Sequence, residues 1–268
     1  MTVCLSKLFA GVALALVPAM LASPSVDGAG SSRPNNPPRP SIALMEVPGT
    51  PAPGVVLTFS GETSSAAIHV PLGADERAAI SPGSSLAVIL KSSLPNTNTA
   101  VARIFNEVGL EVRQMLVAPL DHVAISDDGR LAVFGGLPTA DIAAWSMLAF
   151  YDSSGQAVVI PDRRFGPEVV GTFSPSGDYF AFLASNAAQF TNPRGVTLLV
   201  FDRTFQEVGK HNFDDWPLSS ALRPPIINEG RHEITLVRAT GGPTTAEREI
   251  LVLGLDGELK TVEKEAQQ

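Results

Sequence analysis

The sequence predicts an all-β protein built from repeated four-stranded antiparallel sheets. Its 268 residues include 23 Gly and 22 Pro, which indicates many turns between short elements. Two kinds of apolar–turn–apolar hairpin recur along the chain, and they alternate. An apolar content of 44% is high enough for a sizeable core, so general disorder is excluded.

The first kind of hairpin has an apolar strand that ends at a polar turn, followed by a longer apolar strand. Its copies pair AAIS with SLAVILKS, VAIS with RLAVFGG, GTFS with DYFAFLAS, and PPIIN with HEITLVRA, turning at Ser81, Ser126, Ser174 and Asn228. Gly129 and Gly177 stand three residues after their serines, where a tight or left-handed turn suits glycine. We expect the serines, with Asp128 and Gly177, to make turn hydrogen bonds.

The second kind of hairpin also has a short polar turn between apolar strands. Its five copies turn at Ser60, Asn106, Asp152, Asp202 and Asp256. Two hairpins in each unit of about 45 residues give four antiparallel strands, which is the period and strand count of a β-propeller blade. The second kind forms the outer half of each blade and the first kind the inner half. Five copies of the outer hairpin and four of the inner one predict five blades, with one inner hairpin missing.

Two stretches carry a resemblance to a known family. FSPSGDYFAF at 173–182 and ISDDGRLAV at 125–133 resemble the S-P-D-G-x-x-x-A-F blade signature of TolB-type and WD-repeat-like propellers. The resemblance extends over about residues 54–264. It implies a propeller fold in which each serine turn joins the innermost strand of a blade to the next strand.

The N-terminal region predicts export. Residues 1–22 combine Lys7, an apolar run and small residues, as in a secretory signal peptide, although an uncleaved N-terminal anchor helix is the alternative. The apolar run is too short to span a membrane. Residues 23–53 form a Pro-rich linker with one candidate strand at 41–47, and residues 54–268 form the propeller domain. We therefore expect a periplasmic or extracellular protein.

Cysteine content and charge exclude several classes of protein. Cys4 is the only cysteine and lies in the predicted signal, so the exported chain would have no disulfide. Without Lys7 the chain has 18 Lys and Arg against 27 Asp and Glu, a net charge of −9, which disfavours nucleic acid. The sequence has no H-E-x-x-H, no G-x-S-x-G and no phosphate-binding G-x-x-x-x-G-K-[ST]. We expect no metal and no cofactor.

The missing inner hairpin leaves closure of the ring open. The segment 41–47 falls where the second strand of the first blade belongs, and the linker or a ring-closing strand would supply the innermost one. Otherwise the edge stays open, and a second subunit or a partner's strand can pair with it.

Candidate binding residues lie in the loops that enter the innermost strands, at 72–76, 117–122, 161–168 and 212–220. The candidates are Asp121, His122, Arg163, Arg164, Asp214, Asp215 and Trp216. Arg side chains suit carboxylates or phosphates, paired carboxylates beside an aromatic ring suit a ligand, and Asp with His suits acid–base chemistry. The alternative is that the Arg and Asp residues pair with one another and the aromatic side chains fill gaps between blades.

Three functions remain open. The leading hypothesis is a non-catalytic propeller that binds a protein or an assembly through its loop face or an open blade edge. A glycan or small-ligand binder is the second hypothesis. A hydrolase using carboxylates from several blades is the third, and it requires Asp75, Asp121, Glu168 and Asp215 to converge on one pocket.

Overall fold

The computed structural model describes most of the chain after residue 40. The described residues are 41–47, 54–60, 68–91, 99–136, 146–159, 163–186, 194–217, 220–240 and 247–266. They belong to one compact unit, Pro37–Gln268. The predicted signal peptide and most of the predicted linker lie outside the described residues.

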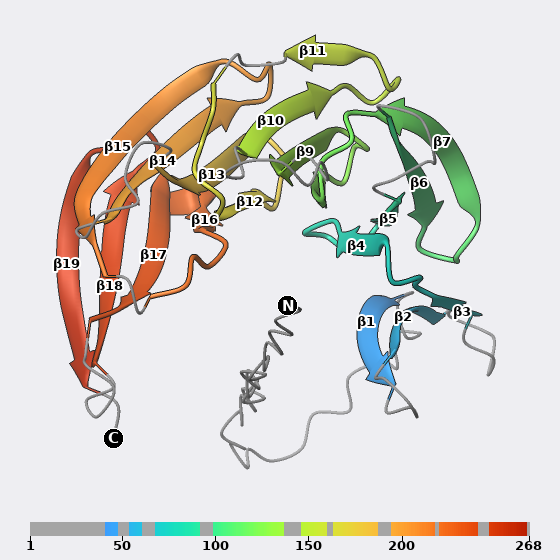
Figure 1. The fold of residues 1–268 in the computed structure, drawn as a ribbon, viewed down its shortest axis with the longest axis horizontal. Helices are drawn as coiled ribbons and strands as arrows, with labels where there is room; N and C mark the ends of the chain where they lie inside the picture. The colour runs from blue at the N-terminus through green and yellow to red at the C-terminus, as the bar shows by residue number, and fades with distance from the viewer. Residues whose placement is uncertain are drawn as a thin grey trace, which may run out of the picture. The chain divides into compact units, whose positions relative to one another are not determined.

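Nineteen strands in the described residues form five antiparallel sheets, and in every sheet the strands follow chain order (Figure 1). The first sheet contains β1 (Ser41–Val47), β2 (Gly54–Ser60) and β3 (Ile68–Pro71). The second contains β4 (Glu76–Ile80), β5 (Leu86–Lys91), β6 (Ala100–Asn106) and β7 (Glu111–Val117). The third contains β8 (His122–Ile125), β9 (Leu131–Gly136), β10 (Ser146–Tyr151) and β11 (Ala157–Val159).

The fourth and fifth sheets repeat this arrangement. The fourth contains β12 (Val169–Phe173), β13 (Tyr179–Ser185), β14 (Arg194–Asp202) and β15 (Glu207–Trp216). The fifth contains β16 (Ile226–Asn228), β17 (Glu233–Ala239), β18 (Glu247–Gly254) and β19 (Leu259–Ala266). One 3-10 turn, Glu229–Arg231, joins β16 to β17.

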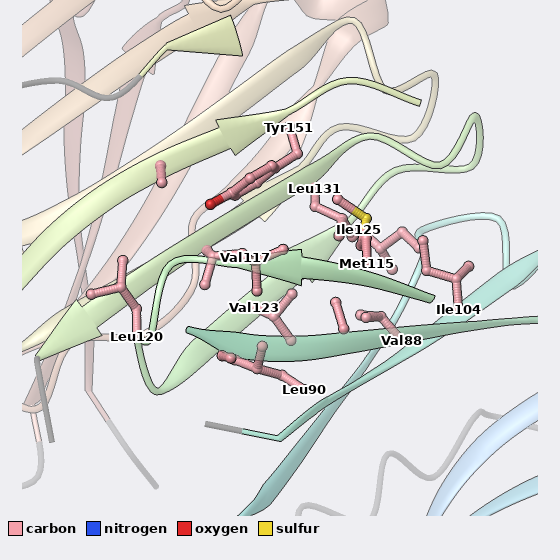
Figure 2. Close-up of a cluster of buried hydrophobic side chains, with 14 residues drawn as sticks. Val88, Leu90, Ile104, Met115, Val117, Leu120, Val123, Ile125, Leu131 and Tyr151 are labelled. Carbon is pink, nitrogen blue, oxygen red and sulfur yellow. The ribbon is translucent and has the colours of Figure 1, made fainter. Parts of the chain in front are cut away.

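Buried side chains form four clusters, each between two consecutive sheets. The central strands supply side chains to the clusters on both of their faces. Val88 and Leu90 of β5 face the third sheet, whereas Ala87 and Ile89 face the first. A strand covered on both faces needs apolar residues at successive positions, which explains runs such as LAVIL. Figure 2 shows the cluster between the second and third sheets, where the Tyr151 hydroxyl accepts a hydrogen bond from the Ala118 amide at 2.7 Å.

The first strands of consecutive sheets also contact one another. β4 contacts β8, and β8 contacts β12. Sheets that follow one another and meet through their first strands are the blades of a propeller. The fold is a five-bladed β-propeller, as the repeats predict, and the first blade has three strands in the described residues.

The serine turns have the chemistry that the sequence predicts. The hydroxyls of Ser81, Ser126 and Ser174 each accept a hydrogen bond at 3.0 Å from the amide at the start of the next strand or immediately before it. Gly129 and Gly177 have φ angles of 84° and 78°. These turn hydrogen bonds and left-handed glycines confirm the prediction for the two closest copies of the repeat.

Neighbouring turns are joined by contacts between the blades. The Asp127 carboxylate in the third sheet accepts from the Gly83 amide in the second at 2.8 Å. Arg130 donates to the Gly177 carbonyl in the fourth sheet at 2.6 Å. Glu229, after β16, accepts from the Ser176 amide at 3.1 Å. Each blade from the second to the fifth is therefore tied to a neighbour through its turns.

One of these turns contains a carboxylate with a shifted pKa. Partial burial of Asp128 would by itself raise its pKa, but hydrogen bonds from Arg130 and Ser126 outweigh this effect and lower it. Arg130 donates to both Asp128 oxygens, at 2.9 and 3.0 Å. The ionised carboxylate thus holds the guanidinium that bridges to the next blade.

Candidate functional site

The inner edge of the first sheet is the most distinctive feature of the described chain. In the other four sheets a short strand precedes the two longer central strands. In the first sheet β1 takes the place of the second strand, and it pairs with β2 from Ser41↔Ser60 to Val47↔Gly54. Among the described residues no strand pairs with the other edge of β1 (Figure 1).

Exposure of side chains on β1 follows from this open edge. Ile42 and Leu44 lie opposite Phe59 and Leu57, so all four side chains share the face that packs against the second sheet. Leu57 is fully buried, whereas Leu44 is 42% exposed. A residue on the core face at this exposure indicates that no described strand covers this edge of β1.

The strand β4, which lines the other side of this edge, is also incompletely covered. Ala78, Ala79 and Ile80 are only partly buried, although the corresponding residues of β8, Val123–Ile125, are buried. A groove of about 530 Å³ lies here between β1 and β4. We call it the edge groove, and it is lined by Leu44, Leu72, Gly73, Ala74, Glu76, Arg77 and Ala78.

Charged side chains at the edge groove hold its own loop in place. Glu76 accepts from the Gly73 amide at 2.8 Å, and Arg77 donates to the Ala74 carbonyl at 3.3 Å. Next to them Asp75 lies 3.7 Å from the Lys91 ammonium. The groove therefore offers apolar contact, loop backbone and a strand edge with which no described strand pairs. These groups suit binding, and the described lining holds no nucleophile or paired acid.

The structure brings the predicted residues Asp121 and His122 together at the start of β8. His122 Nε2 lies 3.7 Å from Asp121 Oδ1, and the imidazole stacks on Phe134. Asp121 also accepts from the Gly136 amide at 3.1 Å. Its carboxylate occupies the space that a side chain at Gly135 would fill. The two groups are half exposed and line neither of the pockets described here.

The predicted residues Arg163 and Arg164 are exposed before β12. Arg163 donates to Glu207 at 2.6 Å, so its ion pair is with the first residue of β15 and not with Asp214 or Asp215 at the other end of that strand. It stands at a pocket of about 200 Å³ between the third and fourth sheets. Leu148, Val159, Phe165, Leu199, Phe201 and Phe205 form the apolar wall of that pocket.

The predicted residues Asp214, Asp215 and Trp216 lie in β15, which runs to Trp216, so the expected loop at 212–220 begins later than its sequence suggests. Asp214 and Asp215 are exposed, whereas Trp216 is 1% exposed. The Trp216 indole packs against Phe213 and donates to the Ser220 carbonyl at 3.2 Å. In this position the ring fills the core between the fourth and fifth sheets and offers no surface to a ligand.

Sequence analysis missed Arg238, which lies close to both Trp216 and Asp215. Its guanidinium lies 5.6 Å from the Trp216 ring, 3.9 Å from Asp215 and 2.8 Å from Glu249. Arg238 and Glu249 are directly opposite on β17 and β18. Only the strand register reveals this cluster, because the residues are far apart in the sequence.

The carboxylates required by a multi-blade hydrolase do not meet in a described pocket. Asp75, Asp121, Glu168 and Asp215 line neither the edge groove nor the pocket at Arg163. In the described part of the chain, no three His, Cys, Asp or Glu side chains are placed to hold a metal ion. Across the same residues, no helix is long and apolar enough to cross a membrane.

Comparisons with known proteins find structures of similar fold. TolB from Acinetobacter baumannii is 12% identical with a TM-score of 0.44, over 85% of this chain and 53% of that one. The β-propeller domain of the Trilobed protease from Pyrococcus furiosus is 8% identical with a TM-score of 0.39, over 85% and 81%. An acylaminoacyl peptidase from Pyrococcus horikoshii is 10% identical with a TM-score of 0.39, over 84% and 44%.

The likeness to these structures is one of fold alone. The chain spans about half the length of the TolB chain. No family model matches the sequence, and no curated protein matches it.

Proposed function

We propose that this protein is an exported, non-catalytic β-propeller that binds a partner protein at the open edge of its first sheet. The observation that carries the proposal is Leu44. It lies on the core face of β1, opposite the fully buried Leu57, and is nevertheless 42% exposed at the edge groove. An open strand edge beside an apolar groove is a ready surface for another chain.

Burial supplies the driving force for such binding. Covering Leu44 and the partly buried residues of β4 removes apolar surface from water, which favours association. The described lining of the groove has no nucleophile and no pair of acids, so the surface suits recognition better than chemistry. Export is supported by the signal-like residues 1–22.

Site-specific photo-crosslinking in the producing cells tests the proposal. A photoreactive amino acid at position 44 should give a discrete adduct with one partner protein. The matched control is position 45, because Met45 is 51% exposed on the opposite face of the same strand. We expect the adduct from position 44 and not from position 45.

Two results would overturn the proposal. The binding site is wrong if both positions give the same adducts or none. Export is wrong if the protein is recovered in the cytosol with its N-terminus intact at Met1, since a cleaved signal predicts a shortened chain outside the cytoplasm.

A further inference from the structure

We infer that the partner supplies an extended segment that pairs with β1 as the fourth and innermost strand of the first sheet. This inference rests on the proposed function and deepens it, because it names the conformation and the chemistry of the occupant. The segment would pair antiparallel to β1 and fill the edge groove against β4.

The geometry of the neighbouring blades argues for a strand. In the second, third and fourth sheets a first strand lies beside the second strand and contacts the first strand of an adjacent blade. Neighbouring strands are about 4.8 Å apart, whereas a helix with its side chains is about 10 Å wide. A strand also satisfies the backbone groups along the edge of β1, which a helix cannot do.

The chain's own first strands show which residues suit this position. They are three to five residues long, with the sequences ERAAI, HVAI, VVGTF and IIN. Their last three residues are uncharged and mostly small or β-branched. Such side chains fit where first strands of adjacent blades meet, and β-branched residues also favour the extended conformation. The partner's segment should have the same pattern and contain no Pro, because Pro cannot donate to the ladder.

Residues next to β1 in the chain are poorly suited to supply this strand. A hairpin with β1 would have to use the stretch just before Ser41, which is RPNNPPRP. Its four prolines have no amide hydrogen for the ladder and restrict the residues before them. The strands described from β2 to β19 are already placed in their own sheets. Because neither that stretch nor any described strand is suited to the position, we assign the occupant to a different chain.

A peptide that copies a first strand tests the inference on the full chain. The probe is fluorescein-labelled LDHVAISD, which copies residues 120–127 around β8. Its binding is measured by fluorescence anisotropy, and hydrogen exchange of β1 amides is measured with and without peptide. We expect saturable binding, slower exchange in β1, and at least tenfold weaker binding of the same peptide with Pro in place of Ala124.

Two substitutions on adjacent β1 residues provide the matched comparison. Leu44→Arg places a charge in the edge groove and should weaken peptide binding at least tenfold. Met45→Arg places the same charge on the opposite face and should change binding by less than twofold. Unchanged melting temperatures would show that both variants remain folded.

Each other outcome overturns the inference in a recognisable way. If position 44 crosslinks to a partner but the peptide neither binds nor protects β1, the proposed function stands and strand pairing is wrong. If neither experiment succeeds, both are wrong. If only a variant lacking residues 1–40 binds the peptide, the chain closes its own edge. If light scattering shows a dimer that Leu44→Arg dissociates, a second copy occupies the edge.

Discussion

Removal of the Trp216 side chain should strongly destabilise the propeller. Trp216 is 1% exposed and lies in the cluster between the fourth and fifth sheets. Trp216→Ala leaves a cavity, removes the edge-on contact with Phe213 at a centroid distance of 5.4 Å, and leaves the Ser220 carbonyl without its indole donor. Buried Trp-to-Ala substitutions cost about 3–5 kcal/mol, so we expect a loss in this range.

Urea denaturation followed by far-UV circular dichroism measures this loss. The control is Val262→Ala, because Val262 is 47% exposed on β19 and its truncation should change the free energy of unfolding by less than about 0.5 kcal/mol. Trp216→Phe should fall between the two, since it keeps a ring but loses the N–H donor.

A loss below about 1 kcal/mol for Trp216→Ala would refute the packing argument. If the same variant also lost partner binding, the ring would belong to a binding face, and the segments 161–168 and 212–220 would have to be considered as the functional surface. A large loss of stability with intact partner binding is the result that the buried position predicts.

Two further predictions concern the turns and the start of β8. Burial alone would raise the pKa of Asp128, but hydrogen bonds, first from Arg130, outweigh it, so the pKa is lowered in the folded protein. The ionised carboxylate therefore stabilises the fold fully at pH values above its unfolded pKa of about 3.9. This stabilisation is lost as the pH falls through the folded pKa. Urea midpoints should therefore fall more steeply below about pH 4 in the wild type than in Asp128→Asn, and parallel pH profiles would contradict this. Gly135→Ala should lower the free energy of unfolding by about 1–3 kcal/mol, because φ at this position is 114° and the new Cβ would lie 1.8 Å from Asp121 Oδ1. The control is Gly136→Ala, which has open space around it and should change the free energy of unfolding by less than about 0.5 kcal/mol. Equal losses in the two variants would refute the argument from backbone strain and steric clash at Gly135.

The repeat could be recognised from sequence because its turns are local. Ser126 and Gly129 lie within four residues of each other, and the turn needs only a hydroxyl acceptor and a left-handed residue. The degenerate copy at Ser81 follows the same geometry with Ser84 at a φ of 57°, in the place where the copies at Ser126 and Ser174 have Gly. Turn chemistry and the alternation of the two kinds of hairpin thus suffice to predict the order of the strands in the repeated sheets.

Long-range contacts explain what sequence analysis missed. The stretch from Asn212 to Trp216 has the composition of a polar loop, but β14 extends far enough to pair Arg194 with Trp216 across an irregular register. The exposure of Leu44 reflects the absence of a strand beside β1 among the described residues, whereas its own sequence neighbours are ordinary strand residues. No local pattern encodes either feature.

The contacts between turns also limit how the blades could be rearranged. The third blade makes hydrogen bonds to both of its neighbours, through Asp127 to the second blade and through Arg130 to the fourth. The fifth blade makes its hydrogen bond to the fourth through Glu229. Blades of equal strand count are therefore not interchangeable modules. Transplanting the fifth blade into the third position would place His232 where Arg130 stands and leave the Gly177 carbonyl without that donor. An engineered propeller made by duplicating one blade would have to rebuild these junctions, and the turns would be the first segments to redesign.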